Sequence, residues 1–479
     1  MIRHPAILLL ALALVFASQA YGSCFSIFEN GVRASGMGGA FVAIANDGSA
    51  IFYNPAGIAF QKGMRMQMDG LVVVGLFRST PSSTPAGTIV PEKGYNLNYS
   101  PHFIPVMSMY LTKDLSQRWT AGFGVFAPFG LAANATSFKD SDPKPTKYVG
   151  RYAGTRGQLQ SFWFQPTIAY RLSKSSSIAV GVAWVHTHLL IEESILNPLD
   201  DGKVFGEQVA SKVFPGMNTT LSGAAIARML PEGRARFAGT SDSPGYNAGY
   251  LFKHEKSGTN VGLMWRSAVT HHLSGEASFA FTTGYALENF VGKDAIPKLF
   301  PKQAISASFT TPATYSMGVS NSSLLKGLLS LQVDIQDYKR FKDVPLNFTQ
   351  TEDTATPEEL RLTFSMQTSY IVRGGYEKNI GERNTLRAGY VFDHTPVTDK
   401  SVGPLFPDSS RNSITVGMSR VRNNAEFSFF YQAMWYCSRI TDVMENQKIF
   451  TNGEYNNFVH LFGFAMRMRM GLATNPFDR

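Results

Sequence analysis

Apolar and polar residues alternate in short segments over most of the chain after residue 60. In residues 162–170 the even positions are apolar, and a second alternating run, 178–184, follows the polar turn 171–177. Successive side chains of a β-strand point to opposite faces, so each run predicts a strand with one apolar face. Two such strands joined by a short turn predict an antiparallel hairpin. The same alternation recurs in residues 329–336, 386–392, 414–419 and 427–435.

Such strands can belong to a soluble β-sandwich or to a membrane barrel. Composition favours the barrel: charged residues make up 16% of the chain, aromatic residues 13%, and 43 residues are Gly. Past the first two dozen residues no apolar run could form a spanning helix. Tyr170, Trp184 and Trp435 lie near strand ends, where barrels carry aromatic girdles. The expected fold is an all-β transmembrane antiparallel barrel, closed because an open edge in lipid leaves backbone groups unpaired.

The N-terminus has the features of a secretory signal peptide. Arg3 and His4 precede an apolar run, 6–16, and the small residues Ser18 and Ala20 follow it. A positive start, a short apolar centre and small residues before the cleavage site are typical of such peptides. We therefore expect residues 1–20 to be removed on export.

A second interpretation of this region concerns Cys24. Gly22, Ser23 and Cys24 resemble the end of a lipoprotein cleavage box, with Cys24 as the acylated residue, but Tyr21 stands where the box has a branched aliphatic residue. Cys437 is the other cysteine of the chain. One disulfide is possible in an oxidising compartment, although the spacing does not require it.

The connections between predicted strands differ in length. Residues 171–177, 378–384 and 420–425 are short turns, whereas 192–260 and 341–362 are long, polar and interrupted by Gly and Pro. Outer-membrane barrels have short periplasmic turns and longer extracellular loops. We expect the two long segments to be external loops.

Residues 28–60 differ from the rest of the chain. Small residues dominate, and Gly and an Asn54-Pro55 turn interrupt them. Such a segment can pack inside a barrel lumen, although an ordinary leader before the first strand is the alternative. We divide the mature chain into an N-terminal hatch, 21–62, and a barrel, 63–479.

Several motifs now carry a family resemblance. Ser35-Gly36-Met37-Gly38-Gly39-Ala40 and Asn54-Pro55-Ala56 resemble the N-terminal hatch of the FadL/TodX family of outer-membrane transporters for hydrophobic compounds. The resemblance implies about fourteen strands, a hatch in the lumen, no catalytic chemistry and no cofactor. It continues in order through residues 122–132, 166–172, 263–275, 386–390 and 407–411.

The resemblance assigns gating to the hatch residues Asn54, Pro55 and Ala56. The Asn54 amide can donate and accept hydrogen bonds, and so could tie the hatch to the wall. Pro55 restricts Asn54 to extended geometry. A turn that only packs is the alternative.

The resemblance also places a lateral opening at a strand kink, which here corresponds to Pro128, Phe129 and Gly130. Pro128 has no N–H for the ladder, and Gly130 tolerates unusual backbone geometry. A gap in strand pairing is what a door between strands needs. A bulge without a transport role is the alternative.

The substrate is less well defined. Fatty-acid transporters of the family place an arginine where this chain has Glu192 and Glu193. An acidic pair repels a carboxylate unless a cation such as Arg151, Arg156 or Arg387 lies near. This difference favours a neutral hydrophobic substrate such as an aromatic hydrocarbon.

The expected function is passive transport of long-chain fatty acids or other hydrophobic compounds across a Gram-negative outer membrane, by a monomer. No catalytic residue, metal ligand or cofactor site is predicted, because paired histidines such as His186 and His188 lack a third ligand and no nucleotide motif is present. The net charge of +9 indicates lipopolysaccharide rather than nucleic acid as a partner. A surface adhesin or structural barrel, and a barrel lipid hydrolase, are the alternatives.

Overall fold

The computed structural model describes residues 24–81, 97–98, 103–134, 151, 154–195, 212, 233–284, 288–350, 352–403, 405–442 and 452–470. The predicted signal peptide and the first residues of the possible lipoprotein box lie outside these ranges.

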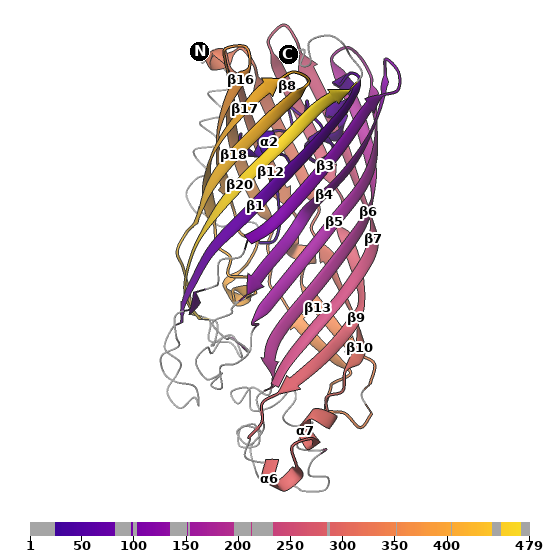
Figure 1. The fold of residues 1–479 in the computed structure, drawn as a ribbon, viewed down its shortest axis with the longest axis vertical. Coiled ribbons are helices and arrows are strands. Elements are labelled where there is room, and N and C mark those ends of the chain that lie inside the picture. Colours follow the sequence, from indigo (N-terminus) through magenta and orange to yellow (C-terminus); the bar gives the residue numbers. More distant parts are fainter. Residues whose placement is uncertain are drawn as a thin grey trace.

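The described strands form one closed antiparallel β-barrel (Figure 1). The first strand, β1 (Met64–Pro81), pairs along its whole length with the last, β20 (Gly453–Met470), which closes the sheet. The barrel has fourteen passes, because several passes are built from two of the twenty strands, as with β8 (Thr259–Arg266) and β9 (Val269–Phe281). The predicted fourteen-stranded antiparallel barrel is confirmed.

The remaining elements complete the barrel and its connections. The other strands are β2 (Leu97–Asn98), β3 (Phe103–Asp114), β4 (Trp119–Asn134), β5 (Arg156–Arg171), β6 (Ser176–Ile195), β7 (Gly233–His254), β10 (Gln303–Thr311), β11 (Thr314–Asn321), β12 (Leu328–Gln336), β13 (Asp343–Phe348), β14 (Glu359–Thr363), β15 (Ser369–Ile380), β16 (Asn384–Asp393), β17 (Arg411–Arg422), β18 (Ala425–Tyr436) and β19 (Arg439–Thr441). The short helices are α2 (Val32–Ser35), α3 (Ala50–Tyr53), η1 (Pro55–Phe60), α6 (Glu288–Val291), α7 (Ala295–Lys298), η4 (Leu324–Lys326), η5 (Tyr338–Arg340) and η6 (Asp399–Ser401). No helix within the described ranges is long and apolar enough to cross a membrane.

The apolar faces of the strands point outward. On β6, Ile178, Val180, Val182 and Trp184 are 43–54% exposed, while the residues between them are buried. A soluble sandwich would bury such a face, whereas a membrane barrel presents it to lipid. The alternation in the sequence therefore reports the exterior of the barrel.

The prediction of two long loops was partly wrong. Strand β7 occupies 22 residues of the segment 192–260, and β13 and β14 lie within 341–362. On β7, Thr240 and Asp242 are outward-facing, and Ser241 and Ser243 are buried polar residues. Because polar residues lie on both faces of this part of β7, the sequence does not alternate between apolar and polar positions there, and the strand could not be recognised.

The described N-terminal segment, residues 24–62, lies inside the barrel. Almost all of it is buried, including the whole of α2 and α3. Helix α2 contacts β17 and β18, while η1 contacts β5, β6 and β7 across the lumen. The segment therefore reaches several sides of the wall, and its contacts with the wall define the candidate site.

Candidate functional site

Asn54 joins two parts of the N-terminal segment to the barrel wall. Its Nδ2 donates to the carbonyl oxygen of Val42 at 2.8 Å and to that of Tyr250 on β7 at 3.0 Å. Its Oδ1 accepts from the N–H of Ala56 at 3.2 Å. The side chain is fully buried, so each of these bonds is made away from water.

Pro55 and Ala56 extend this anchor. Pro55 begins η1 directly after Asn54, whose φ of −164° and ψ of 100° are extended. The hydroxyl of Ser177 on β6 donates to the carbonyl oxygen of Ala56 at 2.8 Å. Gly249 on β7 provides the space for the Asn54 side chain, because a Cβ at this position would overlap Oδ1 of Asn54. The three residues thus lie together against β6 and β7.

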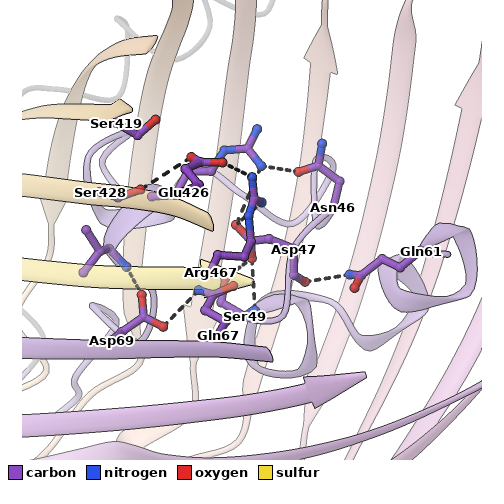
Figure 2. A network of polar contacts seen from close by, with 12 residues as sticks. Asn46, Asp47, Ser49, Gln61, Gln67, Asp69, Ser419, Glu426, Ser428 and Arg467 are labelled. Carbon is purple, nitrogen blue, oxygen red and sulfur yellow. Dashed lines mark hydrogen bonds and ion pairs between the residues drawn. The ribbon is translucent and has the colours of Figure 1, made fainter. Parts of the chain in front are cut away.

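A buried charged network holds the other side of the segment (Figure 2). Arg33 of α2 donates from Nη2 to Glu377 of β15 at 2.8 Å, and Arg387 of β16 donates to the same carboxylate at 2.6 Å. Arg467 of β20 bonds Glu426 of β18 and lies 3.8 Å from Asp47. Buried charges are stable only when paired and hydrogen-bonded, as these are.

Two further contacts fix residues 38–42, and sequence reasoning missed both. Gln332 of β12 accepts from the N–H groups of Phe41 and Val42, each at 2.8 Å. Arg373 of β15 donates to the carbonyl oxygen of Gly38 at 2.9 Å and pairs with Asp334 at 2.7 Å. Side chains of the wall thus satisfy backbone groups of the irregular segment, as buried backbone requires.

The wall has a gap in pairing between β3 and β4. The ladder between these strands runs from Asp114↔Thr120 to Met109↔Val125 and ends there, although β3 continues to pair with β1 as far as Phe103. The ladder of β4 with β5 is shifted between Phe126 and Phe129, which is a β-bulge. The gap adjoins Pro128, Phe129 and Gly130, where the sequence predicted a kink.

The front of the N-terminal segment occupies this gap. Ile27 donates its N–H to the carbonyl oxygen of Pro128 at 2.8 Å, and Gly130 donates to that of Phe25 at 2.9 Å. The Asn30 side chain donates to the carbonyl oxygen of Ala127 at 3.1 Å and accepts from its N–H at 3.2 Å. The segment therefore supplies the hydrogen bonds that β3 does not make.

A cavity of about 380 Å³ lies beside the gap. On β4 and β5 its lining includes inward-facing residues, such as Phe129 and Leu159, and outward-facing ones, such as Gly130, Gln160 and Phe162. The cavity thus passes around the edge of β4 from the lumen to the outer face. The rest of its wall is mainly apolar, including Leu71, Val73, Val106, Phe406, Met434, Val459 and Leu461.

The charged residues among the described lining are Glu29, Asp408 and Arg411. Arg411 pairs with Asp393, with Nε and Nη2 each 2.8 Å from one carboxylate oxygen, and donates to the Tyr436 hydroxyl at 2.9 Å. Asp408, in the connection before β17, accepts from the N–H of Cys24 at 3.0 Å and from the Thr395 hydroxyl. Burial raises the pKa of Asp408 to about 6, and the Arg411 charge opposes the rise.

Aromatic rings surround Phe25 next to the cavity. Its ring centroid lies 5.2 Å from those of Tyr338 and Phe341, 6.0 Å from Phe129 and 6.3 Å from Phe406. Rings at these separations attract each other beyond simple burial. Phe25 is 1% exposed, so its ring is buried within this aromatic cluster.

The arginines that could neutralise a carboxylate near Glu192 and Glu193 lie elsewhere. Arg156 lies 3.8 Å from Glu192, which Arg236 also approaches at 3.4 Å, and Arg387 belongs to the buried network. Arg151 is buried but does not line the cavity. Glu192 therefore has cationic neighbours, whereas the sequence alone left open whether a cation lies near it.

The cysteines and histidines form no site within the described ranges. Cys24 and Cys437 are free thiols, so the possible disulfide is absent. His186 is 2.9 Å from Asp242 on the outer face, and His271 lies inside strand β9. No group of described residues could hold a metal ion.

Comparison with known proteins gives the following matches. The model of the family described as "Outer membrane protein transport protein (OMPP1/FadL/TodX)" matches residues 13–467. The outer membrane protein NMB0088 of Neisseria meningitidis serogroup B is 25% identical to this chain over 416 residues. The alignment covers 86% of this chain and 85% of that protein.

Solved structures agree in fold. A FadL homologue from Pseudomonas aeruginosa superposes with a TM-score of 0.72 at 15% identity, over 94% of this chain and all of that one. The toluene transporter TodX of P. putida gives 0.65 at 14% identity over 95% and 99%, and the Ralstonia pickettii toluene transporter TbuX gives 0.63 at 16% over 93% and 100%. At these identities the similarity concerns the fold alone.

Proposed function

The chain belongs to the outer membrane protein transport family (OMPP1/FadL/TodX), and on that premise we propose that it lets neutral hydrophobic molecules pass from its lumen sideways through the barrel wall into the membrane. Members of this family are outer-membrane channels for hydrophobic compounds and not enzymes. The N-terminal segment acts as the hatch, and the gap between β3 and β4 is the exit.

The cavity at the edge of β4 carries this proposal. Its wall is mainly apolar, and it adjoins both the lumen and the outer, lipid-facing side of β5, where Gln160 and Phe162 lie. A hydrophobic molecule gains about 25 cal/mol for each Å² of apolar surface that leaves water. A route from an apolar cavity directly into lipid avoids returning that surface to water.

The charges at the cavity favour a neutral solute over a carboxylate. Among the described residues that line the cavity, Arg411 is the positively charged one. Its Nε and Nη2 both bond the Asp393 carboxylate. Glu29 and Asp408 add negative charge, which repels another carboxylate. Two of the structural relatives are toluene transporters, which agrees with an uncharged substrate.

The exit requires the front of the hatch to leave the gap. The bonds from Ile27 to Pro128 and from Gly130 to Phe25 must break, while Asn54 can keep the rear of the hatch on β7. Asn54, Pro55 and Ala56 are then the anchor, and Pro128, Phe129 and Gly130 are the edge that opens. Solute would pass between this edge and residues 105–106 of β3.

Uptake by cells with and without the protein tests the proposal. We expect faster entry of a labelled monoaromatic hydrocarbon and little change for a labelled long-chain fatty acid, each normalised to folded barrel. Faster fatty-acid entry would overturn the neutral substrate class. Unchanged entry of both would favour the adhesin or structural barrel.

A variant separates exit through the wall from other routes. Gly130→Val adds a side chain where even a Cβ would lie 2.6 Å from Cδ1 of Ile27. The clash pushes Ile27, and with it the front of the hatch, away from β4, so we expect the variant to speed hydrocarbon entry if the edge of β4 is the exit. Gly70→Val is the control, because that outward-facing glycine of β1 has open space around it.

A further inference from the structure

One end of the barrel carries a ring of exposed basic side chains. Six short turns, which join β3–β4, β5–β6, β7–β8, β11–β12, β15–β16 and β17–β18, lie at this end, away from α6 and α7 (Figure 1). The described acidic residues that are exposed here are Glu255 and Glu382. The exposed basic residues, which we call the basic ring, are Lys113, Arg118, Lys174, Lys256, Lys326, Lys378, Arg383, Arg420 and Arg422.

At the opposite end, the residues that the structure describes show no such excess. Exposed residues of both signs lie together there, and several form ion pairs, such as Lys302 with Glu276 at 2.8 Å and Arg361 with Glu359 at 2.6 Å. The exposed charge of the described residues is therefore distributed unevenly between the two ends. An uneven distribution of this kind marks a surface with an anionic partner.

The basic ring adjoins the outward apolar band. Leu172 lies two residues before Lys174, Ile380 two residues after Lys378, and Met418 two residues before Arg420, and these apolar side chains are 48–52% exposed. Arg118 precedes the exposed Trp119 and donates to the hydroxyl of Tyr170 at 3.1 Å. Tryptophan and tyrosine at strand ends mark the headgroup level of a membrane.

We propose that the basic ring binds anionic phospholipid headgroups of the periplasmic leaflet. Short turns of outer-membrane barrels face the periplasm, so the ring meets phospholipid rather than lipopolysaccharide. Lysine and arginine at headgroup level attract anionic lipids, and the attraction decays within a Debye length. This inference does not depend on which solute the barrel transports.

Native mass spectrometry of the full-length folded protein tests the inference. The protein is released into mild detergent from bilayers of equal parts phosphatidylglycerol and phosphatidylcholine, and the retained lipids are counted. We expect phosphatidylglycerol to exceed phosphatidylcholine by at least about fivefold, and the excess to fall as salt is added. Equal retention of the two lipids would overturn the proposal.

Charge removal at the two ends supplies matched variants. Lys174→Gln, Lys256→Gln, Lys326→Gln and Lys378→Gln together remove four of the nine charges of the basic ring and should clearly lower the phosphatidylglycerol excess. The control combines Arg78→Gln, Lys298→Gln, Lys302→Gln and Lys342→Gln at the opposite end and should keep the excess. If the turn variant keeps the excess, or the control loses it, the ring is not the binding surface. Circular dichroism confirms that both variants are folded.

Discussion

The side-chain amide of Asn30 bonds both backbone groups of Ala127, at 3.1 and 3.2 Å, as a neighbouring strand would. Ala127 lies in the bulge of β4, beyond the last pair between β3 and β4. A backbone group left unpaired in a buried place costs about 1–3 kcal/mol. Asn30 therefore stabilises the closed wall by replacing the missing part of the ladder.

Asn30→Ala should loosen the gap. The variant leaves the N–H and the carbonyl oxygen of Ala127 without this partner, so the front of the hatch should leave β4 more often. We expect faster hydrogen exchange in peptides that contain Ala127, and faster hydrocarbon entry into liposomes at equal amounts of folded barrel. Asn424→Ala, in an exposed turn, is the control. Unchanged exchange at Ala127 would argue against the role given to Asn30.

Asn54→Ala should have the opposite effect on transport. Asn54 donates to the carbonyl oxygen of Tyr250, and we propose that this bond fixes the rear of the hatch while the front moves. Without the anchor the whole hatch should shift in the lumen and obstruct the route. We expect lower hydrocarbon uptake with unchanged barrel abundance, and no effect of Asn456→Ala on an exposed part of β20. Normal uptake by Asn54→Ala would remove this residue from the gate.

Wall glycines should be needed for the hatch and not for the barrel. A Cβ at Gly375 of β15 would overlap the carbonyl oxygen of Met37, and one at Gly389 of β16 would overlap the N–H of Gly38. Gly375→Ala and Gly389→Ala should displace the hatch, measured as faster proteolysis within residues 24–62 of the folded protein. Gly70→Ala, which has room for a Cβ, should not. Equal proteolysis in all three would show that the hatch tolerates the added methyl groups.

The sequence predicted those parts of the molecule that follow a period. Alternation in residues 178–184 identified a strand of β6 and its lipid-facing side, because lipid requires every outward residue there to be apolar. The same criterion failed for β7, whose residues 240–243 are polar on both faces. A pattern rule cannot recognise a strand whose two faces are alike.

Contacts between the hatch and the wall follow no period. Asn30 and Ala127 are 97 residues apart, and neither belongs to a motif that indicates their contact. Gln332 appeared only as a polar position of a strand, although it accepts two backbone bonds from the hatch. Asn54 stood out because it belongs to a local motif, Asn54-Pro55-Ala56, that resembles the hatch of the family and in which proline fixes its geometry. The site could thus be predicted where a local constraint acts, and not where distant residues meet.

Removing the acidic partners of Arg411 should change the substrate class. Asp393→Asn with Asp408→Asn keeps the shapes of both side chains but leaves Arg411 without the carboxylate that engages its Nε and Nη2. A charge-assisted hydrogen bond to a ligand carboxylate then contributes about 1.5–3 kcal/mol, so fatty-acid affinity should rise about tenfold or more. Hydrocarbon affinity should change little, because an uncharged ring makes no ion pair. Titration calorimetry of the detergent-solubilised barrel measures both, and Asp399→Asn, on an exposed aspartate bonded to Arg439, is the control. A fatty-acid affinity that stays constant in the double variant would mean that the charges around Arg411 do not select the solute.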